Sequence, residues 1–414
     1  MKKLLALVLC FALVAALFVG CSKPTDTPNE SKNPAPNEGE AKSITVGLIC
    51  IGDENDQGYT YNFIRGRDAA AKALEAKGIN VKWITKWNVP EGDACEDANL
   101  ELAEAGCQII FNNSFGFEDY MLKVAAKEEY KDIQFVACTN KQSATDELPN
   151  THNAFANIYE GRYLAGFVAG MKLQQLVENE TIKPEEAVIG YVGAFPYEEI
   201  KSGYTAYFLG ARSVCPSVTM KVQFVNDWSN ATAEGNAAAA LCDMGCKLIS
   251  QHADNSTPAT TAQSKGAFFT SYNNDMISVA PEACLVGTRI DWSIYFCEAI
   301  EAVVNGKEIP QDWSKGIADG AVVLTELNKD IIAPGPEEKL ADIEAGLKDG
   351  SIQVFDTDTF TVGGQKLEHA FARDTDGDFQ PDTDEAVYDG AFHESVFQSA
   401  PYFGLDIDGI ELLN

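Results

Sequence analysis

The sequence predicts an α/β protein whose body consists of two similar lobes, each a parallel β-sheet covered by helices. From residue 43 onward, short runs rich in Ile, Val and Phe alternate with segments of helical spacing. Strands that alternate with helices indicate parallel sheets with covered faces. The strand–helix units fall into one group before residue 150 and another after residue 185. This grouping favours two lobes over the alternative, one closed barrel.

The individual elements are read from hydrophobic spacing. The expected strands are the apolar runs 43–51, 79–86, 107–112, 133–138, 187–193, 219–225, 247–252, 267–272 and 284–289. Near-continuous apolar runs are typical of strands that are buried on both faces. The clearest expected helices are 60–77, 93–105 and 159–177. In the last of these, Tyr163, Phe167 and Met171 recur every four residues and therefore share one helix face.

The first 21 residues are predicted to be a secretory signal. Two lysines precede a mostly apolar, uncharged stretch that is on the short side for a membrane-spanning helix. The stretch ends at Gly20-Cys21 and resembles a bacterial lipobox, in which Cys21 is lipidated and becomes the mature N-terminus. Ordinary secretion with an incidental cysteine is the alternative. Residues 22–42 are rich in Pro and polar residues, so we expect a disordered tether.

The charge of the chain limits its partners. The 62 Asp and Glu residues exceed the 31 Lys and Arg residues, which gives a net charge of −31. Such a chain is repelled by nucleic-acid phosphates, so no nucleic-acid partner is expected. It is also repelled by anionic lipid headgroups. Attachment to a membrane would therefore depend on the lipid at Cys21.

Aromatic and polar residues follow several of the expected strands, where ligands bind in open α/β sheets. The aromatic residues are Tyr59, Phe115, Phe117, Trp228 and Trp292. Aromatic side chains with few basic neighbours indicate a slot for a flat, neutral ring, because stacking on a base contributes about 1–3 kcal/mol. Neighbouring Asp, Asn, Gln and His side chains could read the edge of such a ring. Each single aromatic could equally belong to the core.

No enzyme signature is present in the sequence. The patterns GxxxxGK[ST], GxSxG and HExxH are absent, and nothing groups a nucleophile, a base and an orienting residue. We therefore predict a protein that is not an enzyme, with no catalytic residues and no cofactor. The body cysteines are scattered through apolar runs, which favours buried free thiols over a disulfide framework.

One acidic stretch near the C-terminus resembles a calcium loop. It would use Asp374, Asp376, Asp378 and Glu385. The usual loop has Gly at its sixth position, where this chain has Phe379. A solvated acidic loop is the alternative, and no metal site is predicted.

Several motifs together resemble the basic membrane protein family, the substrate-binding lipoproteins of ABC importers for purine nucleosides and nucleobases. They are DQGYTYNFIRGRDAA (56–70), NVPEGD (88–93), NNSFGFED (112–119), YEGRYLAGFVAG (159–170), GYVGAFPYEEI (190–200), NDWSNATAEGNAAAAL (226–241) and ISQHADN (249–255). The resemblance implies a type-I periplasmic-binding-protein fold of two Rossmann-like lobes joined by a hinge. It further implies a purine ligand in the cleft, an ABC permease as partner, and a lipid-anchored location on the extracytoplasmic face of the cell membrane.

The resemblance also suggests where the lobes divide. It implies a first lobe of residues 43–155 plus about 273–310. The second lobe would then comprise residues 156–272 plus about 311–414, including an acidic C-terminal extension.

The resemblance assigns roles to particular residues. It implies that Tyr59, Phe115 and Trp228 sandwich the ligand and that Trp292 closes the cavity where a ribose would sit. The residues implied to read the polar edges are Asp56, Gln57, His252, Asp254 and Asp275. Arg289 stands where the nucleoside-binding branch typically has Lys, which favours a free base. Two alternative functions remain: a hydrolase such as a nucleosidase, and a surface receptor that signals without transport.

Overall fold

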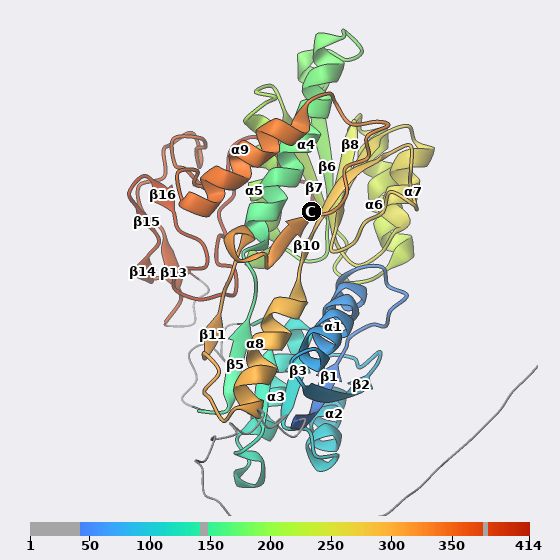
Figure 1. Cartoon of the computed structure of the whole chain (residues 1–414). Helices are drawn as coiled ribbons and strands as arrows, with labels where there is room; N and C mark the ends of the chain where they lie inside the picture. Colours follow the sequence, from blue (N-terminus) through green and yellow to red (C-terminus); the bar gives the residue numbers. More distant parts are fainter. Residues whose placement is uncertain (1–41, 141–147, 376–379) are drawn as a thin grey trace, which may run out of the picture. The chain divides into compact units, whose positions relative to one another are not determined.

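The computed structural model describes residues 42–140, 148–375 and 380–414 (Figure 1). The predicted signal, Cys21 and nearly all of the predicted tether lie outside these residues. Within the described residues, no helix is long and apolar enough to cross a membrane.

The first sheet contains six strands in the order β11-β5-β4-β3-β1-β2, and every neighbouring pair is parallel. Its strands are β1 (Lys42–Ile49), β2 (Ile79–Lys86), β3 (Ile109–Asn112), β4 (Gln134–Ala137), β5 (Thr151–Ala154) and β11 (Asp312–Trp313). Strand β1 lies between β3 and β2, and its apolar side chains are buried on both faces. Val46 and Leu48 belong to one core cluster, and Ile49 belongs to another.

The second sheet contains seven strands in the order β12-β10-β9-β8-β6-β7-β17. Its strands are β6 (Val188–Gly193), β7 (Thr219–Phe224), β8 (Leu248–His252), β9 (Phe268–Tyr272), β10 (Cys284–Ile290), β12 (Val322–Leu324) and β17 (Ile410–Leu412). Only β12 pairs in the antiparallel sense. The five strands that come first along the chain in each sheet have the same spatial order, 2-1-3-4-5, which confirms the predicted fold class of two similar parallel lobes.

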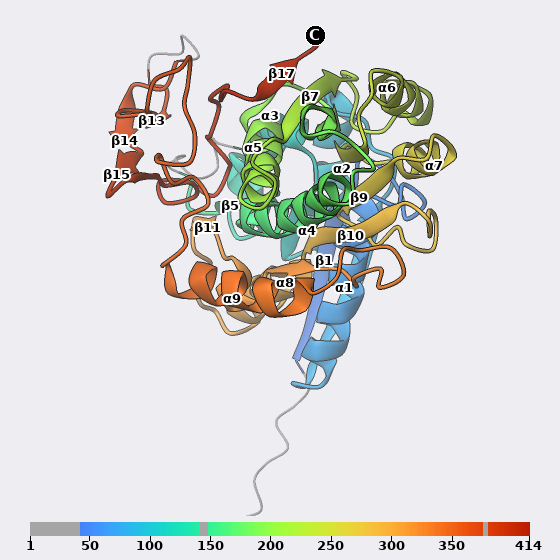
Figure 2. The ribbon, with the colours of Figure 1, turned by 90° about the horizontal axis from the view of Figure 1, so that it is seen from above.

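Helices cover both faces of each sheet (Figures 1 and 2). They are α1 (Tyr59–Glu75), α2 (Asp93–Glu104), α3 (Glu118–Ala125), α4 (Ile158–Glu178), α5 (Glu198–Arg212), α6 (Ala231–Asp243), α7 (Thr257–Ser264), α8 (Trp292–Val304) and α9 (Pro336–Asp349). Helices α1 and α8 pack together, as do α2 with α3, α4 with α5, and α6 with α7. Four short 3₁₀ turns complete the helical elements: η1 (Phe115–Phe117), η2 (Glu128–Tyr130), η3 (Pro184–Glu186) and η4 (Ile317–Asp319).

Helices α4 and α5 approach one another closely because glycines line their contact. A Cβ placed on Gly166 would lie 1.9 Å from the carbonyl oxygen of Tyr207. A larger residue at this position would force the two helix backbones apart. Gly166 and Gly170 of the YEGRYLAGFVAG motif therefore serve the packing of α4 on α5, whereas Gly161 packs against Thr288 of β10.

The chain passes between the two sheets after β5, after β10 and after β11. These crossing segments are tied together, since Phe155 N donates to Trp313 O and Asp291 N donates to Ala321 O. The lobe boundaries expected from the sequence assign two strands, β10 and β11, to the opposite lobe from the one in which they pair. Within 273–310, β10 pairs with β9 in the second sheet, and within 311–414, β11 pairs with β5 in the first. Apolar strands look alike in both lobes, so the sequence pattern could not place these crossings.

The C-terminal part of the chain adds small elements beside the second lobe. They are β13 (Phe371–Arg373), β14 (Thr383–Glu385), β15 (Val387–Tyr388) and β16 (Ala391–Phe392), which form two antiparallel pairs. The final strand, β17, extends the second sheet by pairing with β7. The last strand of the chain therefore belongs to the second sheet.

Candidate functional site

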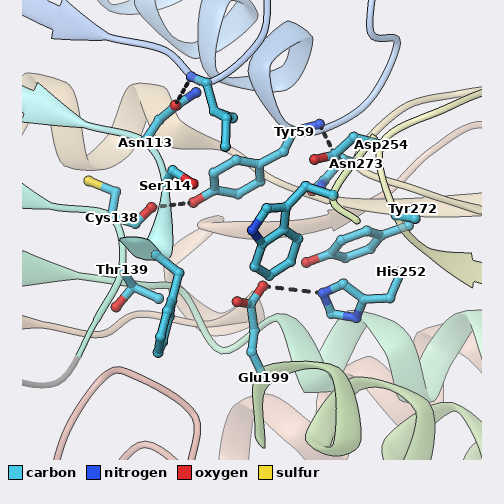
Figure 3. Close-up of a pocket in the computed structure, with 14 residues that line it drawn as sticks. Tyr59, Asn113, Ser114, Cys138, Thr139, Glu199, His252, Asp254, Tyr272 and Asn273 are labelled. Carbon is cyan, nitrogen blue, oxygen red and sulfur yellow. Dashed lines mark hydrogen bonds and ion pairs between the residues drawn. The ribbon is translucent and has the colours of Figure 1, made fainter. Parts of the chain in front are cut away.

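One pocket lies where the carboxyl ends of both sheets face each other (Figure 3). It holds about 420 Å³ of space between protein atoms, counting the part open to solvent. Its lining residues are Ile51, Tyr59, Asn113, Ser114, Phe115, Cys138, Thr139, Glu199, Trp228, His252, Ala253, Asp254, Tyr272 and Asn273. Strand order reverses between β1 and β3 and between β6 and β8, so the pocket sits at the switch point of each sheet, where ligands of such folds bind.

Five of the predicted site residues line this pocket: Tyr59, Phe115, Trp228, His252 and Asp254. Tyr59 is fixed at both ends. Its hydroxyl donates to Cys138 O at 2.8 Å, and its backbone N–H donates to Asp254 Oδ1 at 2.9 Å. The second bond joins the first lobe to the second. Gly58 makes this approach possible, because a Cβ there would lie 2.6 Å from Asp254 Cα.

Four other predicted residues, Asp56, Gln57, Asp275 and Trp292, are not among the lining residues. Asp56 accepts hydrogen bonds from the backbone N–H groups at the start of α1. Asp275 accepts from Ile277 N within its own turn. Gln57 joins the lobes outside the pocket, where its Oε1 accepts from Asn274 Nδ2 at 3.1 Å.

Trp292 packs into the core of the first lobe. It is fully buried, and its ring lies 4.3 Å from Phe63 and 6.0 Å from Tyr59 between centroids. The indole therefore packs against Tyr59 without itself lining the pocket. Because α8 begins at Trp292, the first turn of that helix directs the indole toward α1.

An aromatic cluster spans both lobes and includes two of the lining residues, Phe115 and Trp228. Phe115 from the first lobe stacks on Tyr197 from the second, with ring centroids 5.3 Å apart. Tyr197 stacks on Phe195, which meets Trp228 edge to face at 5.1 Å. Tyr197 is 37% exposed. The predicted pair of Phe115 and Trp228 is thus linked by two aromatic residues that sequence reasoning did not select.

Two further lining residues present buried polar groups without partners among the described residues. Both side-chain atoms of Asn273, Oδ1 and Nδ2, lack a hydrogen bond, and so does the hydroxyl of Tyr272. Leaving such groups unsatisfied costs about 1–3 kcal/mol each. Asn273 offers a donor and an acceptor side by side, which suits a planar heterocycle edge. A ligand with matching polar atoms would satisfy these groups.

Burial favours the neutral forms of two lining residues, His252 and Asp254. Burial lowers the pKa of His252, whose Nε2 lies 3.2 Å from Glu199 Oε1. Burial raises the pKa of Asp254 well above its usual range, and the nearby Asp56 carboxylate adds to the shift. No Lys or Arg is among the residues that line the pocket. The site therefore offers hydrogen bonds with no fixed cation to hold an anionic ligand.

A buried cation lies behind the wall formed by β8 and β9. Arg162 is fully buried and donates to Tyr191 Oη at 2.8 Å and to Ser250 Oγ at 3.0 Å. Its guanidinium lies over the ring of Tyr272 at 5.2 Å. These contacts make Arg162 a support for Tyr272.

Several lining residues were not selected from the sequence: Asn113, Ser114, Thr139, Glu199, Tyr272 and Asn273. Asn113 and Ser114 follow β3, and Asn273 follows β9, so the strand-end rule could have included them. Glu199 enters from the first turn of α5 beside Glu198. Nothing in the sequence separates two adjacent glutamates.

Other expected features lie away from the pocket. Asp376 and Asp378 of the calcium-loop candidate lie outside the described residues, while Glu385 Oε1 accepts from Ala370 N. Among the described residues, no group of three or more His, Cys, Asp or Glu is placed to hold a metal ion. The body cysteines are free thiols, and only Cys242 and Cys297 are partly exposed.

Comparisons with known proteins agree with the fold. Residues 43–356 match the family model described as ABC transporter substrate-binding protein PnrA-like, Bmp. A purine-binding protein of Brucella abortus is 33% identical over 76% of this chain and 83% of its own length. A putative ABC transporter glucose-binding protein of Haloferax volcanii is 29% identical over 76% and 74%.

Solved structures show the same fold. A solute-binding protein of an ABC transporter system from Aeropyrum pernix has a TM-score of 0.61, at 15% identity, over 75% of this chain and 93% of its own. One from Conexibacter woesei has a TM-score of 0.57, at 18% identity, over 75% and 98%. With the family model covering most of the chain, the protein belongs to the PnrA-like family of ABC transporter substrate-binding proteins.

Proposed function

We propose that this substrate-binding protein captures a purine base in the pocket between its lobes and delivers it to an ABC permease. We further propose that it works as a lipoprotein anchored through Cys21 on the extracytoplasmic face of the membrane. The lipobox-like sequence before Cys21 supports the anchor. The family supports an extracytoplasmic binding protein with a small-molecule ligand and a permease partner.

The observation that carries the ligand proposal is the combination of aromatic walls with unpaired neutral polar groups. Tyr59, Phe115 and Trp228 provide ring faces, while Asn273 and Tyr272 present unsatisfied hydrogen-bonding atoms. A planar, uncharged heterocycle can use both features at once. The purine-binding relative supports the same ligand class.

The places of Arg289, Asp275 and Trp292 support a free base over a nucleoside. Arg289 pairs with Asp291 at 3.4 Å, and Asp275 is engaged in its own turn. Neither residue lines the pocket, and Trp292 is buried behind Tyr59. Neither the Arg289 guanidinium nor the Asp275 carboxylate is therefore placed to bind a ribose in the pocket.

A sugar ligand is the second candidate, because the Haloferax relative is described as a putative glucose-binding protein. Aromatic faces beside carboxyl and amide groups can also hold a pyranose ring. The discriminating feature is the ligand's planarity, since a purine offers flat π faces for stacking, whereas a pyranose packs on aromatic rings only through its C–H groups.

The test is a thermal-shift panel on the purified protein with adenine, hypoxanthine, guanine, their nucleosides, AMP and glucose. A ligand that binds only the folded state stabilises it by RT ln(1 + [L]/Kd). We expect the largest shift with a free base and none with AMP, because no Lys or Arg lines the pocket to hold its phosphate. A shift with glucose and none with any purine would contradict the proposal.

A further inference from the structure

The C-terminal segment extends beyond the part of the chain that matches the family. The match ends at residue 356, and the described residues after it run on to 414. Within this segment, residues 394–403 form a loop pinned by a buried carboxylate. Glu394 accepts hydrogen bonds from Tyr402 N at 2.7 Å and from Phe403 N at 3.0 Å. The loop therefore has a defined shape, with Ser399 between its two ends.

This loop is anchored to the second lobe. Just beyond it, Gly404 O and the Asp406 carboxylate both accept from Lys201 Nζ on α5. Further on, β17 joins the second sheet through β7. The base of the loop thus belongs with the second lobe.

Ser399 nevertheless contacts the first lobe. It is fully buried, and its backbone N–H donates to Asp312 Oδ2 at 2.6 Å. Its hydroxyl donates to Asp312 Oδ1 and accepts from Asn153 Nδ2, the latter at 2.7 Å. Asp312 and Asn153 face each other on the paired strands β11 and β5. The hydroxyl of Ser399 therefore has both a donor and an acceptor partner in the first sheet.

These contacts fix the orientation of the Asn153 amide. Its nitrogen is held by Ser399 and Asp312, so its oxygen faces the other way. There, Asn153 Oδ1 accepts from Thr139 Oγ1 at 2.9 Å and from Asn140 N at 3.0 Å. Because a backbone N–H can only donate, the Asn140 contact settles which end of the amide is the oxygen.

The far side of the network is the pocket wall. Thr139 lines the pocket (Figure 3). Asn140 Nδ2 donates to Phe115 O at 2.8 Å, and Phe115 also lines the pocket. A continuous set of hydrogen bonds thus leads from Ser399, through the Asn153 amide, to two residues of the ligand site.

We propose that Ser399 is a positioning residue for the ligand pocket, contributed by the C-terminal segment and acting through Asn153 on Thr139 and Phe115. The affinity part of this proposal rests on the proposed function. The positioning part does not, because it concerns the order of the pocket wall in the ligand-free protein.

The experiment compares Ser399→Ala with Ser395→Ala in the full chain. Ser395 lies in the same loop, and its buried Oγ has no hydrogen-bond partner among the described residues. Amide hydrogen exchange, read by mass spectrometry on a peptide containing residues 134–140, reports the Asn140 N–H. We expect exchange at that position to quicken about three- to ten-fold in Ser399→Ala alone, as loss of one buried hydrogen bond implies.

The second readout is the Kd for adenine and hypoxanthine, for which we expect a weakening of about three- to ten-fold in Ser399→Ala and none in Ser395→Ala. Asp312→Asn, which keeps the side-chain size, should act in the same direction. Equal exchange in the two serine variants would overturn the proposal, and so would faster exchange with unchanged purine affinity. If wild-type protein binds no purine, the proposed function fails and the exchange comparison alone decides the positioning.

Discussion

At the residue scale, the pocket combines ring faces with neutral hydrogen-bonding groups. Trp228 reaches it from the segment after β7 and meets Phe195 edge to face. Asp254 reaches it from the end of β8 and is bound by the backbone of Tyr59. Since each lobe supplies both kinds of group, a flat ligand would contact both lobes and favour their closed arrangement.

Replacing Trp228 by Ala should weaken purine binding with little loss of fold, because the indole is only partly buried and lines the pocket. Loss of one stacking partner costs about 1–3 kcal/mol, or about 5- to 150-fold in Kd. Titration of both proteins with adenine and hypoxanthine measures this change.

Trp87→Ala is the matched control. Trp87 is 37% exposed and lies over Arg67, away from the lining residues. Its removal should leave the Kd unchanged. An equal loss of affinity in both variants would place Trp228 outside the site.

Sequence reasoning could find side chains in the segments that follow strands, such as Tyr59, Phe115 and Trp228. It could not tell which way a side chain turns after the strand ends. Trp292 follows β10 just as Trp228 follows β7, yet the first turn of α8 buries it in the core. Glu199 was missed because helix geometry alone separates it from Glu198.

At the element scale, apolar runs located the central strands of both sheets correctly. Strand β5 was missed because its sequence is Thr-His-Asn-Ala, with no apolar run. Its polar side chains are buried and satisfied by specific partners, as when His152 Nε2 meets Gln134 Oε1 at 2.7 Å. Such partners exist only in the folded chain, so no local pattern could have indicated this strand.

The α4–α5 contact yields a prediction about packing. Gly166→Ala should destabilise the protein by about 1–3 kcal/mol or more, because the new methyl group would meet the Tyr207 carbonyl, which is backbone and cannot turn away. Urea unfolding monitored by circular dichroism measures the loss.

Gly235→Ala on α6 is the comparison. The nearest atom to a Cβ there is the Cγ2 methyl of Thr257, a side chain. Alanine also favours helix over glycine by about 1 kcal/mol. A Gly166→Ala variant as stable as wild type would mean that the two helix backbones are not in contact.

At the scale of the whole molecule, two similar lobes are joined by three crossing segments and bridged by the C-terminal loop. The family match and the repeated strand order confirm the fold that the sequence predicted. The sequence assigned β10 and β11, which lie next to the crossings, to the wrong lobes. The lobe to which a strand belongs depends on its pairing partners, which are distant in the sequence. The C-terminal segment was expected to pack on the second lobe, but its contact through Ser399 with the first depends on three-dimensional proximity.

Buried carboxyl groups make the stability of the whole fold depend on pH. Burial raises the pKa of Glu234 to about 7, and the nearby Asp227 carboxylate adds to the shift. The folded state therefore binds more protons than the unfolded state between about pH 4.5 and 7, so stability falls as pH rises through that range. This group alone accounts for about 3 kcal/mol of the loss.

Glu234→Gln removes this titration while keeping the oxygen that accepts from Asn230 N. The variant should match wild type in melting temperature at pH 4.5 and exceed it at pH 8. Glu75→Gln, at an exposed position on α1, should change neither value. A constant difference between Glu234→Gln and wild type across the pH range would contradict this account.

The central claim is that the two lobes enclose a purine base. Calorimetric titration of the purified protein with adenine, hypoxanthine and glucose tests it most directly. The account predicts saturable one-to-one binding of a purine base, with a negative heat-capacity change as apolar surface is buried. Saturable binding of glucose with no heat from either base would contradict it.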